Sequence, residues 1–102
     1  MNASHAKQIV AGIRAATQKN MKQRGQPIVA ERANTASGSA VRSIYESSPH
    51  ILWMCDQVDK FIEEGRNDKL NRWIGFMQGV MWMTGLATID EMRTMNTIEA
   101  ES

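Results

Sequence analysis

The chain has 102 residues, of which 42% are hydrophobic and 23% are charged, with a formal net charge of +1 at pH 7. This length allows one domain with a single core and excludes two independent cores. The single cysteine excludes an intramolecular disulfide and a cysteine-based metal cluster, so we expect a protein of the reducing cytoplasm. Residues that favour strands are scarce, and these features together predict an all-α fold.

The first part of the chain is strongly basic. Residues 1–27 contain no acid, while residues 28–102 carry more acidic than basic residues. The basic residues of the first part are Lys7, Arg14, Lys19, Lys22 and Arg24. This segment is suited to phosphate, to an acidic partner, or to acidic residues of its own or of a neighbouring subunit.

A basic N-terminal helix is predicted within residues 1–30. Ser4 is a suitable N-cap, and Gly25 and Pro27 supply a stop after Arg24. Apolar residues three or four apart form one narrow stripe, which contains Ala6, Ile9, Val10, Ile13, Ala16 and Met21. Because this stripe is too narrow for a core of its own, we expect the helix to dock against other residues.

The remaining chain is predicted to divide into a linker, a core and a tail. Residues 31–40 are small and polar with a glycine, which is typical of a linker. Residues 41–96 are predicted to form the helical core, which begins with a short helical segment over residues 40–46. Residues 97–102 are predicted to be a frayed tail.

An antiparallel helical hairpin is predicted at the centre of this core. Ser48 as N-cap and Gly65 as stop define a helix over Pro49–Glu64, with the proline at the first helical position. A second helix is predicted over Asp68–Thr84, with a glycine directly after it. The very short connection between them makes the two helices antiparallel neighbours.

A short C-terminal helix is predicted over Ile89–Met95. Thr88 and Glu91 have the spacing of a capping box, in which each side chain accepts a hydrogen bond from the backbone N–H of the other residue. This helix completes an all-α fold built from a basic N-terminal helix, a hairpin and a short C-terminal helix.

The run from Trp73 to Ile89 contains no charged residue. One stripe of the predicted helix faces the rest of the hairpin, but Phe76, Trp82 and Met83 lie off this stripe. A hairpin covers only one side of a helix. These three side chains therefore need a further helix or an oligomer to cover them.

Gly75 and Gly79 are small residues four positions apart, a spacing that lets another helix approach closely. They could seat Trp53 or Trp82 within the chain's own core, or they could seat a second copy of the chain. A membrane span needs about 20 apolar residues. Because the uncharged run is shorter and contains polar residues, we expect no membrane contact.

A segment near the C-terminus carries a recognisable pattern. It consists of Arg72-Trp73-Ile74-Gly75-Phe76, Gln78-Gly79, Gly85, Thr88-Ile89-Asp90-Glu91-Met92-Arg93 and Asn96. In this part, about a quarter of the chain, the sequence resembles small accessory proteins of tailed bacteriophages and prophages. The resemblance implies a gene that acts on host machinery, host defence or gene expression, and hence a location in the cytoplasm of the host cell. It implies no functional residues.

The predicted function is binding without catalysis. The sequence contains no catalytic or metal motif, and we expect no enzyme activity, no metal and no cofactor. His5 and His50 are expected near helix starts, and Cys55 is expected to be a buried apolar residue. We expect an inhibitor that binds a host protein and forms a homo-oligomer through a surface rich in Trp and Met. The predicted interface residues are Trp73, Gly75, Phe76, Met77, Gly79, Trp82 and Met83.

Two other classes of function remain open. In one, the chain is a nucleic-acid-binding regulator whose basic N-terminal helix contacts phosphates. The contacting residues would be Lys7, Arg14, Lys19, Lys22 and Arg24. In the other, an oligomer sequesters a small anionic nucleotide where basic residues of different subunits meet.

Overall fold

The part of the chain that the structure describes is built from helices. The structure is a computed structural model, which describes the backbone of residues 1–33 and 43–101 and the side chains of residues 1–33 and 43–97. The elements are α1 (Ala3–Gln23), α2 (Ile44–Glu63), the 3-10 helix η1 (Asn67–Lys69), α3 (Leu70–Met83) and α4 (Ile89–Glu101). The predicted all-α fold is confirmed.

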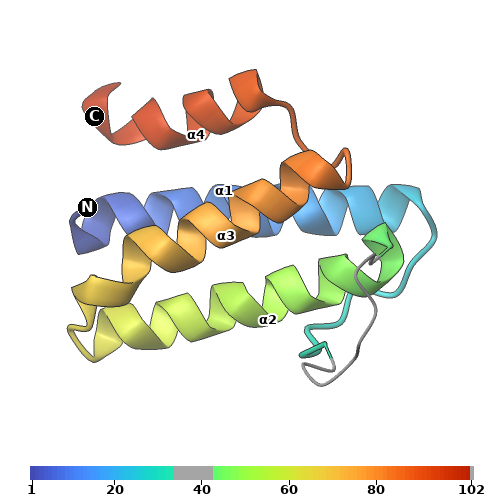
Figure 1. Cartoon of the computed structure of the whole chain (residues 1–102), viewed down its shortest axis with the longest axis horizontal. Helices are drawn as coiled ribbons and strands as arrows, with labels where there is room; N and C mark the ends of the chain where they lie inside the picture. Colours follow the sequence, from blue (N-terminus) through green and yellow to red (C-terminus); the bar gives the residue numbers. More distant parts are fainter. Residues whose placement is uncertain (34–42, 102) are drawn as a thin grey trace.

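Helices α2 and α3 form the predicted antiparallel hairpin. In Figure 1, α1 and α3 run in one direction while α2 and α4 run in the other, so the N-terminus lies at the same end of the bundle as the end of α4. Gly65 follows α2 with a φ of 72°, a backbone conformation that glycine adopts without strain. Helix α3 begins at Leu70 and not at Asp68, because Asn67–Lys69 form the tighter 3-10 turn.

The core lies between α1, α2 and α3. Each helix contributes side chains spaced three and four residues apart, as expected for one buried helix face. The clustered core residues are Ala6, Ile9, Val10, Ile13, Ile51, Met54, Cys55, Val58, Phe61, Leu70, Ile74, Met77, Met81 and Ala87. The basic N-terminal helix therefore docks on the hairpin of its own chain.

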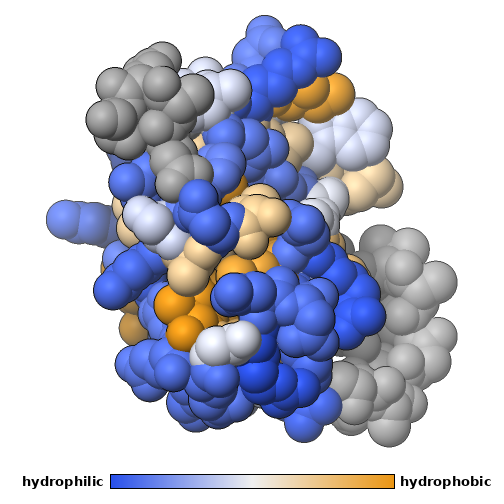
Figure 2. All heavy atoms as spheres, turned by 90° about the vertical axis from the view of Figure 1, so that its left-hand side faces the viewer, coloured by the Kyte–Doolittle hydropathy of each residue, from blue (hydrophilic) through white to orange (hydrophobic). Residues whose placement is uncertain are grey.

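Figure 2 shows that the end of the bundle nearest the termini is mainly hydrophilic, with apolar residues limited to small patches.

The start of α2 differs from the prediction. The helix begins at Ile44 and not at Pro49. The Oγ of Ser43 accepts a hydrogen bond from the N–H of Glu46 at 3.2 Å, so Ser43 is the N-cap and the prediction of Ser48 is wrong.

Pro49 consequently lies inside α2. A proline has no N–H and cannot donate to the carbonyl four residues earlier, which is that of Tyr45. The side-chain Nε2 of Gln26 donates to this carbonyl instead, at 2.6 Å. A residue from the connection between α1 and α2 thus replaces the hydrogen bond that the proline removes.

Helix α1 begins at Ala3, slightly earlier than predicted. The Oδ1 of Asn2 accepts a hydrogen bond from the N–H of His5 at 2.8 Å, so Asn2 and not Ser4 is the N-cap. Asparagine and serine cap helices about equally well, and the earlier of the two residues takes this role here.

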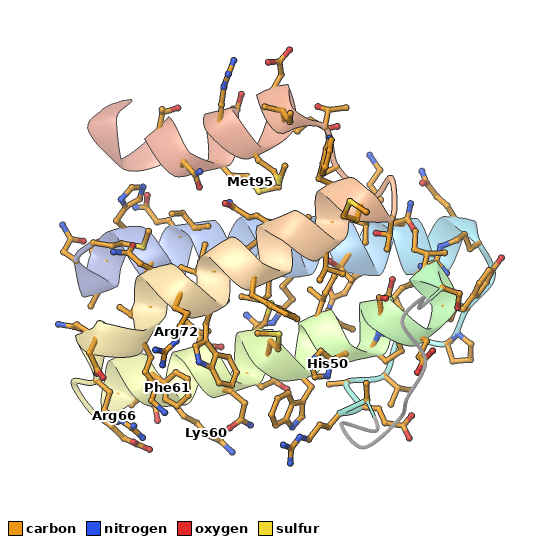
Figure 3. All side chains as sticks on the ribbon, viewed as in Figure 1. His50, Lys60, Phe61, Arg66, Arg72 and Met95 are labelled. Atoms are coloured by element: carbon orange, nitrogen blue, oxygen red, sulfur yellow. The ribbon has the colours of Figure 1, made fainter. Side chains whose placement is uncertain are left out.

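Helix α4 begins with the predicted capping box. The N–H of Glu91 donates to the Oγ1 of Thr88, and the N–H of Thr88 donates to the Oε1 of Glu91, both at 3.1 Å. Figure 3 shows Met95 directed from α4 toward α1. A Cβ built on Gly12 of α1 would lie 3.6 Å from the Cγ of Met95, an ordinary contact distance.

The end of α4 differs from the prediction. The helix does not end at Met95 but runs to Glu101, so residues 97–101 continue α4. These residues include no glycine or proline that would stop a helix. The predictions made for residues 34–42, which belong to the linker and the short segment after it, lie outside the described residues.

Candidate functional site

The surface of α3 that points away from the core is rich in apolar residues. Phe76 is 55% exposed, Trp82 is 52% exposed and Met83 is 75% exposed, which confirms that these side chains lie off the buried stripe. Ile89 at the start of α4 is 48% exposed and lines a shallow groove together with Trp82. The residues that we call the outer face of α3 are Gly75, Phe76, Gly79, Trp82 and Met83.

The two glycines of the outer face of α3 have open space above them. A Cβ added to Gly75 or to Gly79 would meet no described atom within 4 Å. The interpretation that these glycines seat Trp53 or Trp82 within the chain's own core is therefore wrong.

No helix among the described residues is both long enough and apolar enough to span a membrane.

A groove of about 340 Å³ runs between α3 and α4 beside this face. Its lining residues are Gln78, Gly79, Trp82, Ile89, Met92, Arg93 and Asn96. The Nε2 of Gln78 donates to the Oδ1 of Asn96 at 2.8 Å and joins the two helices. The groove therefore has apolar walls, a glycine in its lining and polar groups beside them.

Two of the predicted interface residues lie elsewhere. Met77 is completely buried on the opposite side of α3, where the Sγ of Cys55 lies 3.8 Å from its Sδ, so it cannot contact a partner. Trp73 is half-buried and packs against aromatic residues of α2. The remaining five predicted residues all belong to the outer face of α3.

A second feature is a row of aromatic rings between α2 and α3. The ring of Trp53 stacks on that of His50 with a centroid distance of 5.4 Å, and the ring of Trp73 lies 6.1 Å from that of Trp53. Phe61 meets Trp73 edge-on at 4.9 Å. We call His50, Trp53, Phe61 and Trp73 the aromatic row. Such contacts stabilise a fold by roughly 0.5–1.5 kcal/mol each.

Cationic side chains lie against two rings of the aromatic row, those of Trp53 and Phe61. The guanidinium carbon of Arg32 is 5.2 Å from the ring centroid of Trp53. The guanidinium carbon of Arg66 and the Nζ of Lys69 lie 5.3 Å and 5.0 Å from the ring centroid of Phe61. Cations at these distances are attracted by the negative face of an aromatic ring.

The aromatic row borders an open pocket of about 350 Å³ on the hairpin. Its lining residues are Arg32, His50, Trp53, Met54, Arg72, Trp73 and Phe76. In Figure 3, Arg72, Phe61 and Arg66 all lie toward the turn of the hairpin, and His50 lies nearer the start of α2. The pocket thus combines aromatic walls with two arginines.

The basic N-terminal helix contributes part of its charge to the docking of α1 on α2. The Nη2 of Arg14 lies 2.7 Å from the Oδ2 of Asp59 and 3.1 Å from the Oδ1 of Asp56. Partial burial acts to lower the pKa of Arg14, but the hydrogen bonds and charges of these carboxylates outweigh it, so the pKa is raised. Arg14 is therefore engaged within the chain by two carboxylates of α2.

Arg24 is also used inside the chain. Its guanidinium donates to the Oγ of Ser48 at 3.0 Å and to the Oδ1 of Asn20 at 2.6 Å, and it lies 4.7 Å from the ring centroid of Tyr45. The other members of the predicted phosphate-binding set are Lys7, Lys19 and Lys22, and all three are exposed. The five basic residues thus fall into two groups. The two arginines contact other side chains of the same chain, and the three lysines lie exposed on the surface.

Cys55 and His50 are both engaged within the fold of residues 1–33 and 43–97. Cys55 is buried, and burial raises its pKa to about 12, so its thiol stays protonated near neutral pH and is a poor nucleophile. The Nδ1 of His50 accepts from the N–H of Ala33 at 3.0 Å. Among the described residues, no group of three or more His, Cys, Asp or Glu side chains is placed to hold a metal ion.

The pocket of the hairpin was missed by sequence reasoning. Arg32 falls in the predicted linker, and Trp53 and Trp73 have the spacing of core residues. One available signal is the separation of His50 and Trp53 by three residues, which places both rings on one helix face. The contact between Trp53 and Trp73 depends on the register of two helices, which periodicity does not define.

Comparison with known proteins identifies no relative. No protein-family model matches the chain, and neither a curated protein nor a solved structure gives a significant match.

Proposed function

We propose that the chain is a non-catalytic binding protein that packs a helix of another protein chain against the outer face of α3. The observation that carries this proposal is the combination of two uncovered helical glycines with three large exposed apolar side chains on one helix. Contiguous exposed apolar surface is typical of a protein-interaction site.

The glycines support the proposal because they weaken the isolated chain. A glycine inside a helix lowers stability by about 0.5–1 kcal/mol relative to alanine. Neither Gly75 nor Gly79 has the positive φ that would require a glycine, and no described side chain packs against either. A partner helix that approaches the backbone closely at these positions supplies a reason for both residues.

The groove between α3 and α4 is a suitable seat for an amphipathic helix. Trp82, Ile89 and Met92 supply apolar contacts, while Arg93 and Asn96 supply polar groups beside them. Helices recognised in this way insert apolar side chains at positions three and four apart, and aromatic residues supply much of the binding energy.

The resemblance of the C-terminal segment to phage accessory proteins makes a host protein the expected partner, and inhibition would follow from covering that protein's own contact surface. A second copy of the chain is the other candidate. Either partner would use the outer face of α3, so one set of variants tests both.

The decisive variant is Gly79→Leu, which places a large side chain where the partner helix must approach. Ala15→Leu is a matched control because it adds a similar side chain to an exposed position of α1. Both variants should keep the fold, since leucine favours helix. We expect affinity purification from host lysate, with light scattering of the purified chain, to show that Ala15→Leu keeps the wild-type partner and Gly79→Leu loses it.

Two results would contradict the proposal. One is a Gly79→Leu chain that retains the partner as tightly as the wild type does. The other is a wild-type chain that is monomeric at micromolar concentration and recovers only itself from the lysate. If the partner is a second copy, light scattering detects a dimer that Gly79→Leu converts to a monomer.

A further inference from the structure

We propose that the pocket between α2 and α3 binds a single unpaired nucleotide unit, with the base against Trp53, Trp73 and Phe76 and the phosphate beside Arg72 and Arg32. This site is distinct from the protein contact proposed for the outer face of α3. Only Phe76 belongs to both surfaces.

The aromatic lining favours a flat ring as the occupant. Trp53 and Trp73 lie on opposite helices of the hairpin with their ring centroids 6.1 Å apart and tilted by 38°, so the two indoles form neighbouring walls. Phe76 is more than half exposed and adds an aromatic ring at the border of the same pocket. Stacking of a base on such rings contributes about 1–3 kcal/mol and tolerates any of the bases.

The charges around the pocket select an anion. Arg32 and Arg72 both line it, and none of its lining residues is a carboxylate. A cationic ligand would be repelled by the two guanidinium groups, although aromatic rings alone would attract it. Guanidinium groups bind phosphate oxygens with two parallel hydrogen bonds, a geometry that a lysine does not provide.

The carboxylates of α2 on the side of α1 do not cancel this charge. Asp56 and Asp59 pair with Arg14 and are not among the residues that line the pocket. The net positive charge beside the aromatic rings therefore remains available to a ligand.

The size of the pocket limits the ligand to one unit. Its volume of about 350 Å³ is near the lower end of the roughly 300–1,000 Å³ that is typical of small-molecule sites. This space is suited to one base with its sugar, while the phosphate remains at the open side near the arginines. The same chemistry is offered by a free nucleotide and by one unpaired nucleotide of a single strand.

Fluorescence titration of the full chain with AMP tests the proposal. Two of the three tryptophans line the pocket, so Trp82→Phe gives a chain whose tryptophan emission reports on this site alone. We expect AMP to quench this emission in a saturable way, and adenosine and inorganic phosphate to bind more weakly than AMP. In the same background, Arg72→Gln should weaken AMP binding roughly tenfold, because it removes a charge-assisted contact.

Arg66→Gln is the matched control, since Arg66 lies on the same hairpin near Phe61 but does not line the pocket. This variant should bind AMP within about twofold of the parent chain, because Arg66 does not line the pocket and its exposed charge is screened by salt. The proposal is wrong if AMP causes no saturable change up to millimolar concentration. It is also wrong if Arg66→Gln and Arg72→Gln weaken binding equally, or if inorganic phosphate binds as tightly as AMP.

A hexanucleotide of deoxyadenosine distinguishes the two sources of the ligand. If the oligonucleotide binds more tightly than AMP at equal nucleotide concentration, with an affinity that falls steeply with salt, the unit belongs to a single strand. If the two bind equally, the ligand is the free nucleotide. Circular dichroism of each variant confirms that the helices remain folded.

Discussion

The inner and outer faces of α3 have similar apolar character but different surroundings. The inner face consists of Leu70, Ile74, Met77 and Met81, none of which is more than 2% exposed. The outer face of α3 carries large apolar side chains that the described part of the chain leaves at least half exposed. Composition alone therefore does not distinguish residues that stabilise this fold from residues available to a partner. Substitutions on the two faces can separate these roles.

The largest difference in the free energy of unfolding is expected between substitutions of two methionines of α3. Met77→Ala should lower the free energy of unfolding by about 2–5 kcal/mol, because it removes buried methylenes and leaves a cavity. Met83→Ala should change it by no more than about 0.5 kcal/mol, because that side chain is largely in solvent. Urea denaturation followed by circular dichroism measures both values. Equal losses would mean that the two faces do not differ in the way described.

The stability of the chain at alkaline pH should show whether water reaches the inner face of α3. Cys55 lies against Met77, and burial raises the pKa of its thiol to about 12. Above about pH 9 the unfolded chain releases this proton while the folded chain retains it, so stability should fall as pH rises from 9 toward 12. The thiol should add about 1.4 kcal/mol per pH unit to that fall.

The matching variant for this measurement is Cys55→Ala. It should lose some stability at every pH, but its free energy of unfolding should decline less steeply with alkaline pH than that of the wild type. Below about pH 9 the two curves should run parallel, because the thiol is protonated in both the folded and the unfolded chain. Parallel curves above this pH would show that the thiol is accessible to water.

The smallest expected effect is an increase in the free energy of unfolding. Gly79→Ala should raise the free energy of unfolding by about 0.5–1 kcal/mol, since alanine favours helix and nothing obstructs its Cβ. Gly85→Ala is the control, because Gly85 has a φ of 75° that strains a residue with a Cβ. This variant should lower the free energy of unfolding by about 1–2 kcal/mol. Thermal melts measure both shifts. A destabilised Gly79→Ala chain would indicate that the outer face of α3 is already covered.

The hairpin and the start of α4 could be predicted from sequence because their signals are local. Apolar spacing in both helices, the stop at Gly65 and the capping box at Thr88 depend on residues within a few positions of one another. The start of α2 could not be predicted in this way. A proline inside a helix costs about 3 kcal/mol in isolation, and the hydrogen bond that replaces the one lost at Pro49 comes from the distant Gln26.

The candidate surfaces were predicted to different degrees. Phe76, Trp82 and Met83 could be identified because their helical positions fall off the buried stripe. The pocket could not, because Arg32 and Trp53 are far apart in sequence and Arg72 has no distinctive neighbours. The pairing of Arg14 with Asp56 and Asp59 could not be predicted either, since these carboxylates lie on another helix.

Asn96 connects α4 to two other helices at a single point. Its backbone carbonyl accepts from the Nε2 of His5 at 2.7 Å, and its side-chain amide exchanges hydrogen bonds with that of Gln78. Loss of these bonds and of the packing of Met92 and Met95 against the core would release α4 while α1, α2 and α3 keep their shared core. Amide hydrogens of α4 should therefore exchange with solvent through opening of this helix as a unit, ahead of global unfolding. Any molecule bound between α3 and α4 would favour the closed position of α4 and so slow that exchange. Binding in the groove and opening of α4 are therefore coupled.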